Sequence, residues 1–142
     1  MNGTFVLAGS TQGDWNSVNA GDRNFAALKL DTDGNVMWKW QEGTPQEDQF
    51  NAAVALEGGS TILIGYTYGS WYGENAGDES TSDFAAVKLD ADGIVEWRWQ
   101  DGTVEDDDMR AAASNGSDQV FMAGITEGSW TEGYVNSQDF AA

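Results

Sequence analysis

The chain has 142 residues, neither cysteine nor histidine, and a formal net charge of -18 at pH 7 from 24 acidic and 6 basic residues. The missing residue types exclude disulfides, thiolate nucleophiles, imidazole bases and most transition-metal sites. The charge disfavours nucleic acid and membrane surfaces as partners, and no apolar run approaches the ~20 residues that span a bilayer.

In chain order, the first predicted element is a short strand that returns twice: FVLAGSTQGDW at 5–15, ILIGYTYGSW at 62–71 and VFMAGITEGSW at 120–130. Trp38 and Trp97 are 59 residues apart, as are Phe25 and Phe84. A fixed period of this kind indicates tandem repeats. We therefore treat residues 1–142 as one repeat array with these units: 4–60, 61–118 and a partial third unit, 119–142.

Each unit shows the alternation of apolar and polar residues that is typical of β-strands. One complete unit predicts four strands: NAAVALE, TILIGYT, DFAAVKLD and IVEWRWQ. In the last of these, the pleat places Val95, Trp97 and Trp99 on one face, which we expect to be buried. The D-x-D-G between the last two strands fits a hairpin turn, because Gly and Asp tolerate positive φ. The predicted fold class is all-β, with antiparallel four-stranded repeats.

Four-stranded repeats of this length are typical of β-propeller blades. The runs LDTDGNVMWKWQ and LDADGIVEWRWQ, each followed by an Ala-rich strand, resemble the SBBP-type β-propeller repeat, with a looser similarity to quinoprotein-like propeller repeats. The resemblance covers essentially the whole chain and implies that tryptophans such as Trp38 and Trp97 bridge neighbouring blades.

The length of the chain limits the number of blades. Four blades of this size require about 236 residues, so we expect the chain to be incomplete as a single propeller. Uncovered blade faces and strand edges invite further copies. The expected partner is therefore either the chain itself, as a homo-oligomer or filament, or the rest of a longer propeller.

The two D-x-D-G loops are also candidate calcium ligands, since Ca²⁺ binds carboxylate oxygens: Asp31, Asp33, Asp90 and Asp92. The turn interpretation is favoured over the metal site, because Ile94 stands where a further oxygen ligand is needed. The acidic run at 106–108 is expected to be a solvated loop, with a Ca²⁺ site as the alternative. No other cofactor is expected.

Tryptophans in polar loops form the third candidate site: Trp15, Trp71 and Trp130. A large aromatic ring in such a loop can stack on a sugar or anchor a protein partner. Because the residue recurs in every unit, packing of each loop against the neighbouring blade is the favoured interpretation.

No G-x-S-x-G or P-loop motif occurs, and we expect no enzymatic activity. The predicted function is an acidic structural or interaction scaffold that self-associates through blade faces and strand edges. The alternative is an extracellular module that binds carbohydrate or protein through the tryptophan loops. The sequence leaves the cellular compartment unknown and only slightly favours an extracellular one.

Overall fold

The computed structural model describes residues 3–115, 119–129 and 139–141, with the backbone alone for the last segment. The described part is all-β, with one short 3-10 turn at Glu57–Gly59. Its strands are β1 (Thr4–Thr11), β2 (Asn24–Asp31), β3 (Val36–Glu42), β4 (Asp48–Ala55), β5 (Thr61–Thr67), β6 (Asp83–Leu89), β7 (Val95–Asp101), β8 (Asp107–Ser114), β9 (Val120–Thr126) and β10 (Asp139–Ala141).

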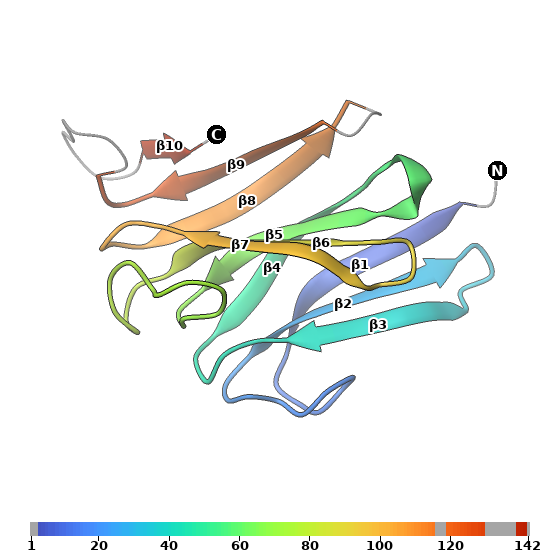
Figure 1. Cartoon of the computed structure of the whole chain (residues 1–142), viewed down its shortest axis with the longest axis horizontal. Helices are drawn as coiled ribbons and strands as arrows, with labels where there is room; N and C mark the ends of the chain where they lie inside the picture. Colours follow the sequence, from blue (N-terminus) through green and yellow to red (C-terminus); the bar gives the residue numbers. More distant parts are fainter. Residues whose placement is uncertain (1–2, 116–118, 130–138, 142) are drawn as a thin grey trace.

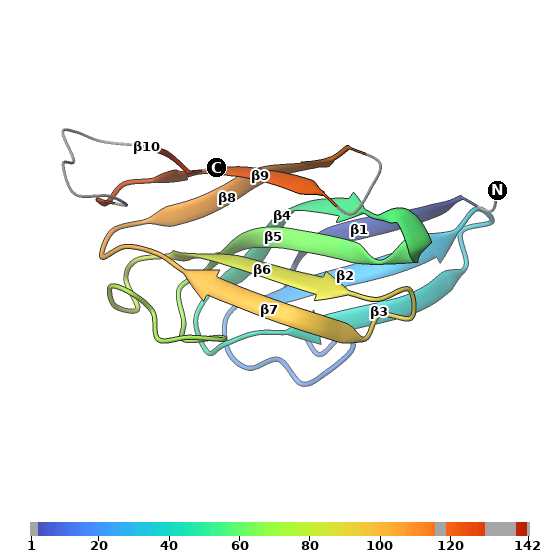
Figure 2. The same cartoon turned by 45° about the horizontal axis from the view of Figure 1, so that its top comes forward.

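These strands form three antiparallel sheets, and the predicted all-β fold class is confirmed. The first sheet has the order β1-β2-β3, the second β4-β5-β6-β7 and the third β8-β9-β10. The second sheet is the complete four-stranded blade and lies between the other two, which cover its opposite faces (Figure 1). The turned view shows the three sheets as stacked layers (Figure 2). The described residues thus form blade-like sheets that do not close into a ring.

The sheets divide the chain at different points from the units counted along the sequence. The second sheet runs from residue 48 to residue 101, so β4 opens that sheet although it lies in the sequence unit 4–60. In the same way β8 opens the third sheet and lies in the unit 61–118. The units 4–60 and 61–118 therefore each contribute their Ala-rich strand to the sheet that follows.

The expectation that Val95 shares a face with Trp97 and Trp99 is wrong, because a β-bulge lies between them. Lys88 pairs with Trp97, whereas the next residue of β6, Leu89, pairs with Val95. The extra residue on β7, Glu96, changes which face of the sheet the side chains before and after it point to. Val95 therefore packs toward the first sheet, while Trp99 packs toward the third.

Two apolar cores hold the sheets together. The core between the first and second sheets, called the first junction, buries Phe25, Ala27, Trp38, Trp40, Phe50, Leu63, Ala85, Val87 and Leu89. The core between the second and third sheets, called the second junction, buries Leu56, Ile62, Ile64, Phe84, Ala86 and Met109. Successive residues of β6 belong to alternate cores, as the period of a strand buried on both faces requires.

Candidate functional site

The first D-x-D-G loop is a hairpin turn whose leading carboxylate is used by the turn itself. Asp31 Oδ1 accepts hydrogen bonds from the backbone N–H of Asp33 at 2.9 Å and of Asn35 at 2.8 Å, and Asn35 Nδ2 donates to Asp31 Oδ2 at 2.9 Å. Gly34 supplies the positive φ of 83°. The Asn35 side chain, followed by the backbone N–H groups, lowers the pKa of Asp31.

The second D-x-D-G loop is built in the same way. Asp90 Oδ1 accepts from the N–H of Asp92 at 2.9 Å and of Ile94 at 2.8 Å, and Gly93 again has a φ of 83°. Within the described residues, no group of three or more aspartate or glutamate side chains is placed to hold a metal ion. The structure thus assigns Asp31 and Asp90 a role in the turns, and calcium binding stays a prediction for experiment.

Trp71 packs between two sheets instead of standing free in its loop. It lies in the β5–β6 connection, and its ring centroid is 4.7 Å from that of Phe25 and 6.5 Å from that of Trp40, both in the first sheet. Its Nε1–H donates to Glu42 Oε2 at 3.2 Å. Trp71 therefore fixes its loop onto the preceding sheet.

Trp15 occupies the matching loop of the first sheet and is half-buried. The Lys39 ammonium nitrogen lies 4.8 Å from the centroid of its ring, within range of a cation–π contact. The backbone N–H of Trp15 donates to Gln41 Oε1 at 2.9 Å. The third residue of this set, Trp130, lies outside the described residues.

Lys29 and Trp38 make further polar contacts across the first junction. The buried Lys29 ammonium donates to Gly59 O at 2.8 Å and to Ala91 O at 3.4 Å. The indole N–H of Trp38 also donates to Ala91 O, at 3.2 Å. Through these bonds, the first sheet holds both the β4–β5 connection and the β6–β7 turn of the second.

The same repeat positions are more open at the second junction. Trp97, which corresponds to Trp38, is 38% exposed, compared with 9% for Trp38. Lys88, which corresponds to Lys29, forms an ion pair with Glu96 at 2.7 Å on its own sheet. The outer strand of the second sheet is thus only partly covered.

At one end of the first junction, Asn24 lies beside the buried Asp48. Asn24 Nδ2 donates to Thr44 O at 3.0 Å and approaches Asp48 Oδ2 at 3.5 Å. The carboxylate also accepts from Thr44 N at 2.6 Å and from Thr67 Oγ1 at 2.5 Å. Burial raises the pKa of Asp48, and these donors oppose the rise.

The second junction has two carboxylates in the corresponding place. Asp83 Oδ1 and Asp107 Oδ2 both lie closer than 3.0 Å to the point where a Cβ on Gly102 would stand. Asp83 accepts from Gln100 Nε2 at 2.9 Å, and Asp107 accepts from Thr103 N at 2.5 Å. Burial raises the pKa of both groups, with a further contribution at Asp107 from the charge of Asp83.

The expectation of a solvated loop at 106–108 is wrong for Asp107. This residue begins β8 and is fully buried, because its carboxylate holds the turn at Thr103. A signal for this role is present in the repeat, since G-T-x-x-x-D occurs at 43–48 and again at 102–107. A buried carboxylate that accepts backbone N–H bonds explains why the spacing recurs.

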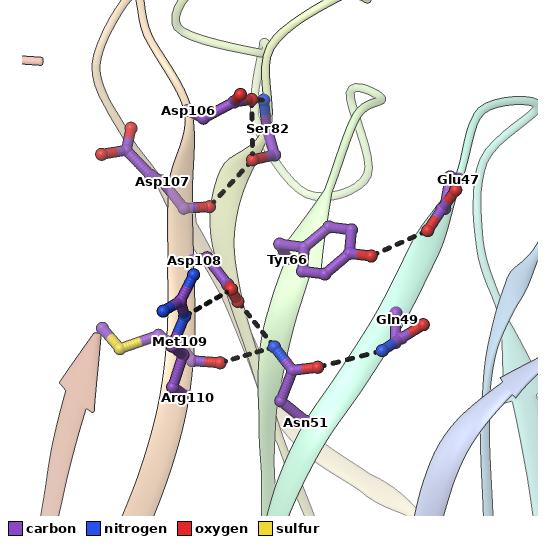
Figure 3. A network of polar contacts seen from close by, with 10 residues as sticks. All are labelled: Glu47, Gln49, Asn51, Tyr66, Ser82, Asp106, Asp107, Asp108, Met109 and Arg110. Atoms are coloured by element: carbon purple, nitrogen blue, oxygen red, sulfur yellow. Dashed lines mark hydrogen bonds and ion pairs between the residues drawn. The ribbon is translucent and has the colours of Figure 1, made fainter. Parts of the chain in front are cut away.

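Further polar contacts join β4 to β8 on the side drawn in Figure 3. Asn51 Nδ2 donates to Asp108 Oδ1 at 2.6 Å and to Met109 O at 2.9 Å. Nearby, the Ser82 hydroxyl is 3.1 Å from Asp106 Oδ1. The acidic run is therefore a structural connection between the second and third sheets.

The outer faces of the first and third sheets expose apolar side chains. On the first sheet, Leu7 is 51% exposed, and Phe5 and Val36 are exposed on the same face. On the third sheet, Phe121 is 67% exposed beside Ala113, its partner across β8 and β9. Both outer faces thus carry large apolar residues that the described chain leaves uncovered.

An apolar cavity of about 590 Å³ lies at the second junction. Its walls come from both sheets: Phe84 and Trp99 of the second sheet, and Met109, Val120 and Met122 of the third, with neighbouring alanines and Phe121. The corresponding space at the first junction is filled by β6, whose Val87 and Leu89 are fully buried.

Within the described residues, no helix is long and apolar enough to cross a membrane. No protein-family model matches the chain, and no curated protein matches it significantly. The similarity to the SBBP-type β-propeller repeat therefore rests on the sequence motifs and stays a prediction.

Proposed function

We propose that this protein is a non-enzymatic, acidic scaffold of the β-propeller type that self-associates through its blade faces and strand edges. The observation that carries the proposal is internal to the chain. Each uncovered outer face corresponds in strand register to a face that is buried between two sheets elsewhere in the same molecule.

The outer face of the first sheet corresponds to the face of the second sheet that the first sheet covers. Leu7 pairs with Leu28 as Leu63 pairs with Val87. Leu63 and Val87 are fully buried at the first junction, whereas Leu7 is 51% exposed. A sheet placed on the outer face of the first sheet would bury the same kind of surface.

The outer face of the third sheet is the matching half of this contact. Phe121 pairs with Ala113 as Ile62 pairs with Val54. Ile62 is buried at the second junction, whereas Phe121 is exposed. We therefore expect the first sheet of a second copy to pack on this face of the third sheet, in the way that sheets already pack inside one chain.

Such a contact is heterologous, because it joins two different faces, and it continues from copy to copy until it closes or forms a fibre. The charge of -18 opposes association at low ionic strength. Salt screens this repulsion and leaves the apolar contact intact, so association is expected to strengthen with moderate salt.

Light scattering on two single variants tests the proposal. Leu7→Asp disrupts only the outer face of the first sheet, and Phe121→Asp disrupts only the outer face of the third. Each variant alone should therefore be monomeric, while the wild type should have a larger molar mass. An equal mixture of the two should give dimers, because each variant retains the face that the other needs. Val18→Asp, at an exposed position in the β1–β2 loop, is the control and should assemble like the wild type.

A monomeric wild type would count against self-association and would leave the rest of a longer propeller as the partner of both faces. Dimers in each variant alone would indicate a symmetric contact instead. The mixture thus separates the proposed head-to-tail contact from other modes of assembly.

Binding of carbohydrate or protein through the tryptophan loops is the second candidate, and Trp15 is the residue that favours it. Its counterpart Trp71 is packed against the preceding sheet, whereas the ring of Trp15 contacts the exposed Lys39. Trp15→Ala should abolish binding on a glycan panel with unchanged thermal unfolding if this candidate is correct. Retention of every glycan signal in the variant would exclude binding through Trp15.

A further inference from the structure

The carboxylate pair at the second junction lies where the third sheet is held to the second. Asp83 is the first residue of β6 and Asp107 the first residue of β8, and both are fully buried. The N–H of Asp107 donates to Ser82 O at 2.7 Å, and the Ser82 hydroxyl donates to Asp107 O at 3.1 Å (Figure 3). A force between the two carboxylates therefore acts directly between two sheets.

The first junction shows how the repeat satisfies this position with an amide. Asn24 Oδ1 accepts from the N–H of Ala20 at 2.7 Å, which leaves the amide nitrogen for the junction. Asn24 Nδ2 donates to Thr44 O at 3.0 Å and lies 3.5 Å from Asp48 Oδ2. The same two atoms, Asn24 Nδ2 and Asp48 Oδ2, are the closest ones to the point where a Cβ on Gly43 would stand. A donor group therefore faces the buried carboxylate.

At the second junction, an oxygen replaces this amide nitrogen. For Gly102, which corresponds to Gly43, the two closest atoms are Asp83 Oδ1 and Asp107 Oδ2. The other oxygen of Asp83, Oδ2, accepts from Gln100 Nε2 at 2.9 Å. Two acceptor oxygens thus lie side by side, and a hydrogen stands between them only if one carboxyl group is protonated.

The surroundings of the pair supply no compensating positive charge. Within the described part of the chain, neither carboxylate forms an ion pair with a basic side chain. The neighbouring charged groups are acidic: Asp101 at the end of β7, and Asp106, whose carboxylate accepts from Ser82 N. Burial, followed by the charge of a neighbouring carboxylate, raises the pKa of both Asp83 and Asp107.

We infer that the second junction binds one proton between Asp83 and Asp107, in the place of the Asn24 amide hydrogen, and that loss of this proton loosens the third sheet from the second. At low pH, the protonated carboxyl group of one residue donates to the other and reproduces the contact of the first junction. As the pH rises, the proton leaves and two negative charges repel each other between the sheets. The contribution to stability is full below the ordinary pKa of 3.8 and is lost as the pH rises through the raised values.

Hydrogen exchange at two backbone amides of each junction tests the inference, because the N–H groups are bonded in the same way. At the second junction, Thr103 N–H donates to the Asp107 carboxylate and Asp107 N–H to a backbone carbonyl. Their counterparts at the first junction are Thr44 and Asp48. After correction for intrinsic exchange, protection of Thr103 and Asp107 should fall by about tenfold between about pH 5 and pH 8. Protection of Thr44 and Asp48 should fall less, because the amide beside Asp48 needs no proton.

Asp83→Asn removes the need for the proton. Its amide should face Asp107 as Asn24 faces Asp48, so the protection of Thr103 should become as weakly dependent on pH as it is at the first junction. Glu79→Gln, which removes one charge at an exposed position of the β5–β6 loop, is the matched control. This variant should keep the pH dependence of the wild type.

A titration of the carboxyl carbon of Asp107 by NMR reports the proton itself. In the wild type, this carbon should titrate in two steps that it shares with Asp83, whereas in Asp83→Asn it should titrate in one step. All atoms of the pair belong to one chain, so the result does not depend on self-association. A single, independent step for each carboxylate in the wild type would overturn the inference. An equal fall in protection at both junctions, or the same fall in Asp83→Asn as in the wild type, would overturn it as well.

Discussion

At the first junction, Asn24 donates a hydrogen bond to a backbone carbonyl beside the buried Asp48, whereas at the second junction Asp83 stands in the place of the asparagine, beside Asp107. The two sites share the same glycine and threonine framework. An amide beside a carboxylate satisfies both groups. Two carboxylates repel each other unless one is protonated. The replacement of an amide by a carboxylate at this one buried position should therefore make the two junctions respond differently to pH.

The largest expected effects come from exchanging these residues between the junctions. Asn24→Asp should lower the free energy of unfolding at pH 7 by about 3 kcal/mol, because it removes a buried donor and adds a second buried carboxylate. Asp83→Asn should raise it by about 1 kcal/mol, because the amide can donate to its neighbour as Asn24 does. Urea unfolding followed by tryptophan fluorescence measures both changes.

The pH dependence gives the control for this exchange. The pKa values of Asp83 and Asp107 are raised by burial above their ordinary value of 3.8. Between pH 3.8 and the raised pKa values, the folded state therefore binds more protons than the unfolded state. The stabilising contribution of this protonation is full below pH 3.8 and is lost as the pH rises through the raised pKa values. Asp101, on the neighbouring strand, adds negative charge near Asp83 and acts in the same direction.

The difference in the free energy of unfolding between the wild type and Asp83→Asn should accordingly become smaller as the pH falls toward 4. The difference between the wild type and Asn24→Asp should shrink as well. A difference that is constant between pH 4 and pH 8 would show that the carboxylate pair has no part in either effect.

Trp38 and Trp97, which occupy the same repeat position, provide a smaller contrast. Trp38→Phe should lower the free energy of unfolding by about 2 kcal/mol, since it removes both the bond to Ala91 O and buried apolar area. Trp97→Phe should lower it by about 0.5 kcal/mol, because the ring is 38% exposed. Thermal unfolding of the two variants compares them directly. Equal losses would mean that Trp97 is covered in solution, as assembly through this part of the molecule would require.

Much of the fold could be predicted from the sequence. Period-two alternation and D-x-D-G placed the strands and hairpins, because these features depend on local backbone geometry. The bulge at Glu96 could not be predicted, since the extra residue fits the same alternation until its pairing with β6 is known. The burial of Asp107 was missed for a similar reason. Thr103 is only four residues away, but Thr126, on β9, meets Asp107 only after the third sheet has folded.

The smallest effects are expected in the D-x-D-G turns, where they separate the turn from a calcium site. Asp31→Ala should lower the midpoint of thermal unfolding by a few degrees, because Asp31 accepts two backbone N–H bonds, whereas Asp33→Ala should leave it unchanged, since the exposed Asp33 contributes only its backbone N–H. The lowered pKa of Asp31 means that its contribution is present above 3.8 and is lost as the pH falls further. Addition of Ca²⁺ or EDTA should shift neither midpoint. A calcium site would behave differently, because both carboxylates would then be ligands and Ca²⁺ would raise the midpoint of the wild type but not that of either variant.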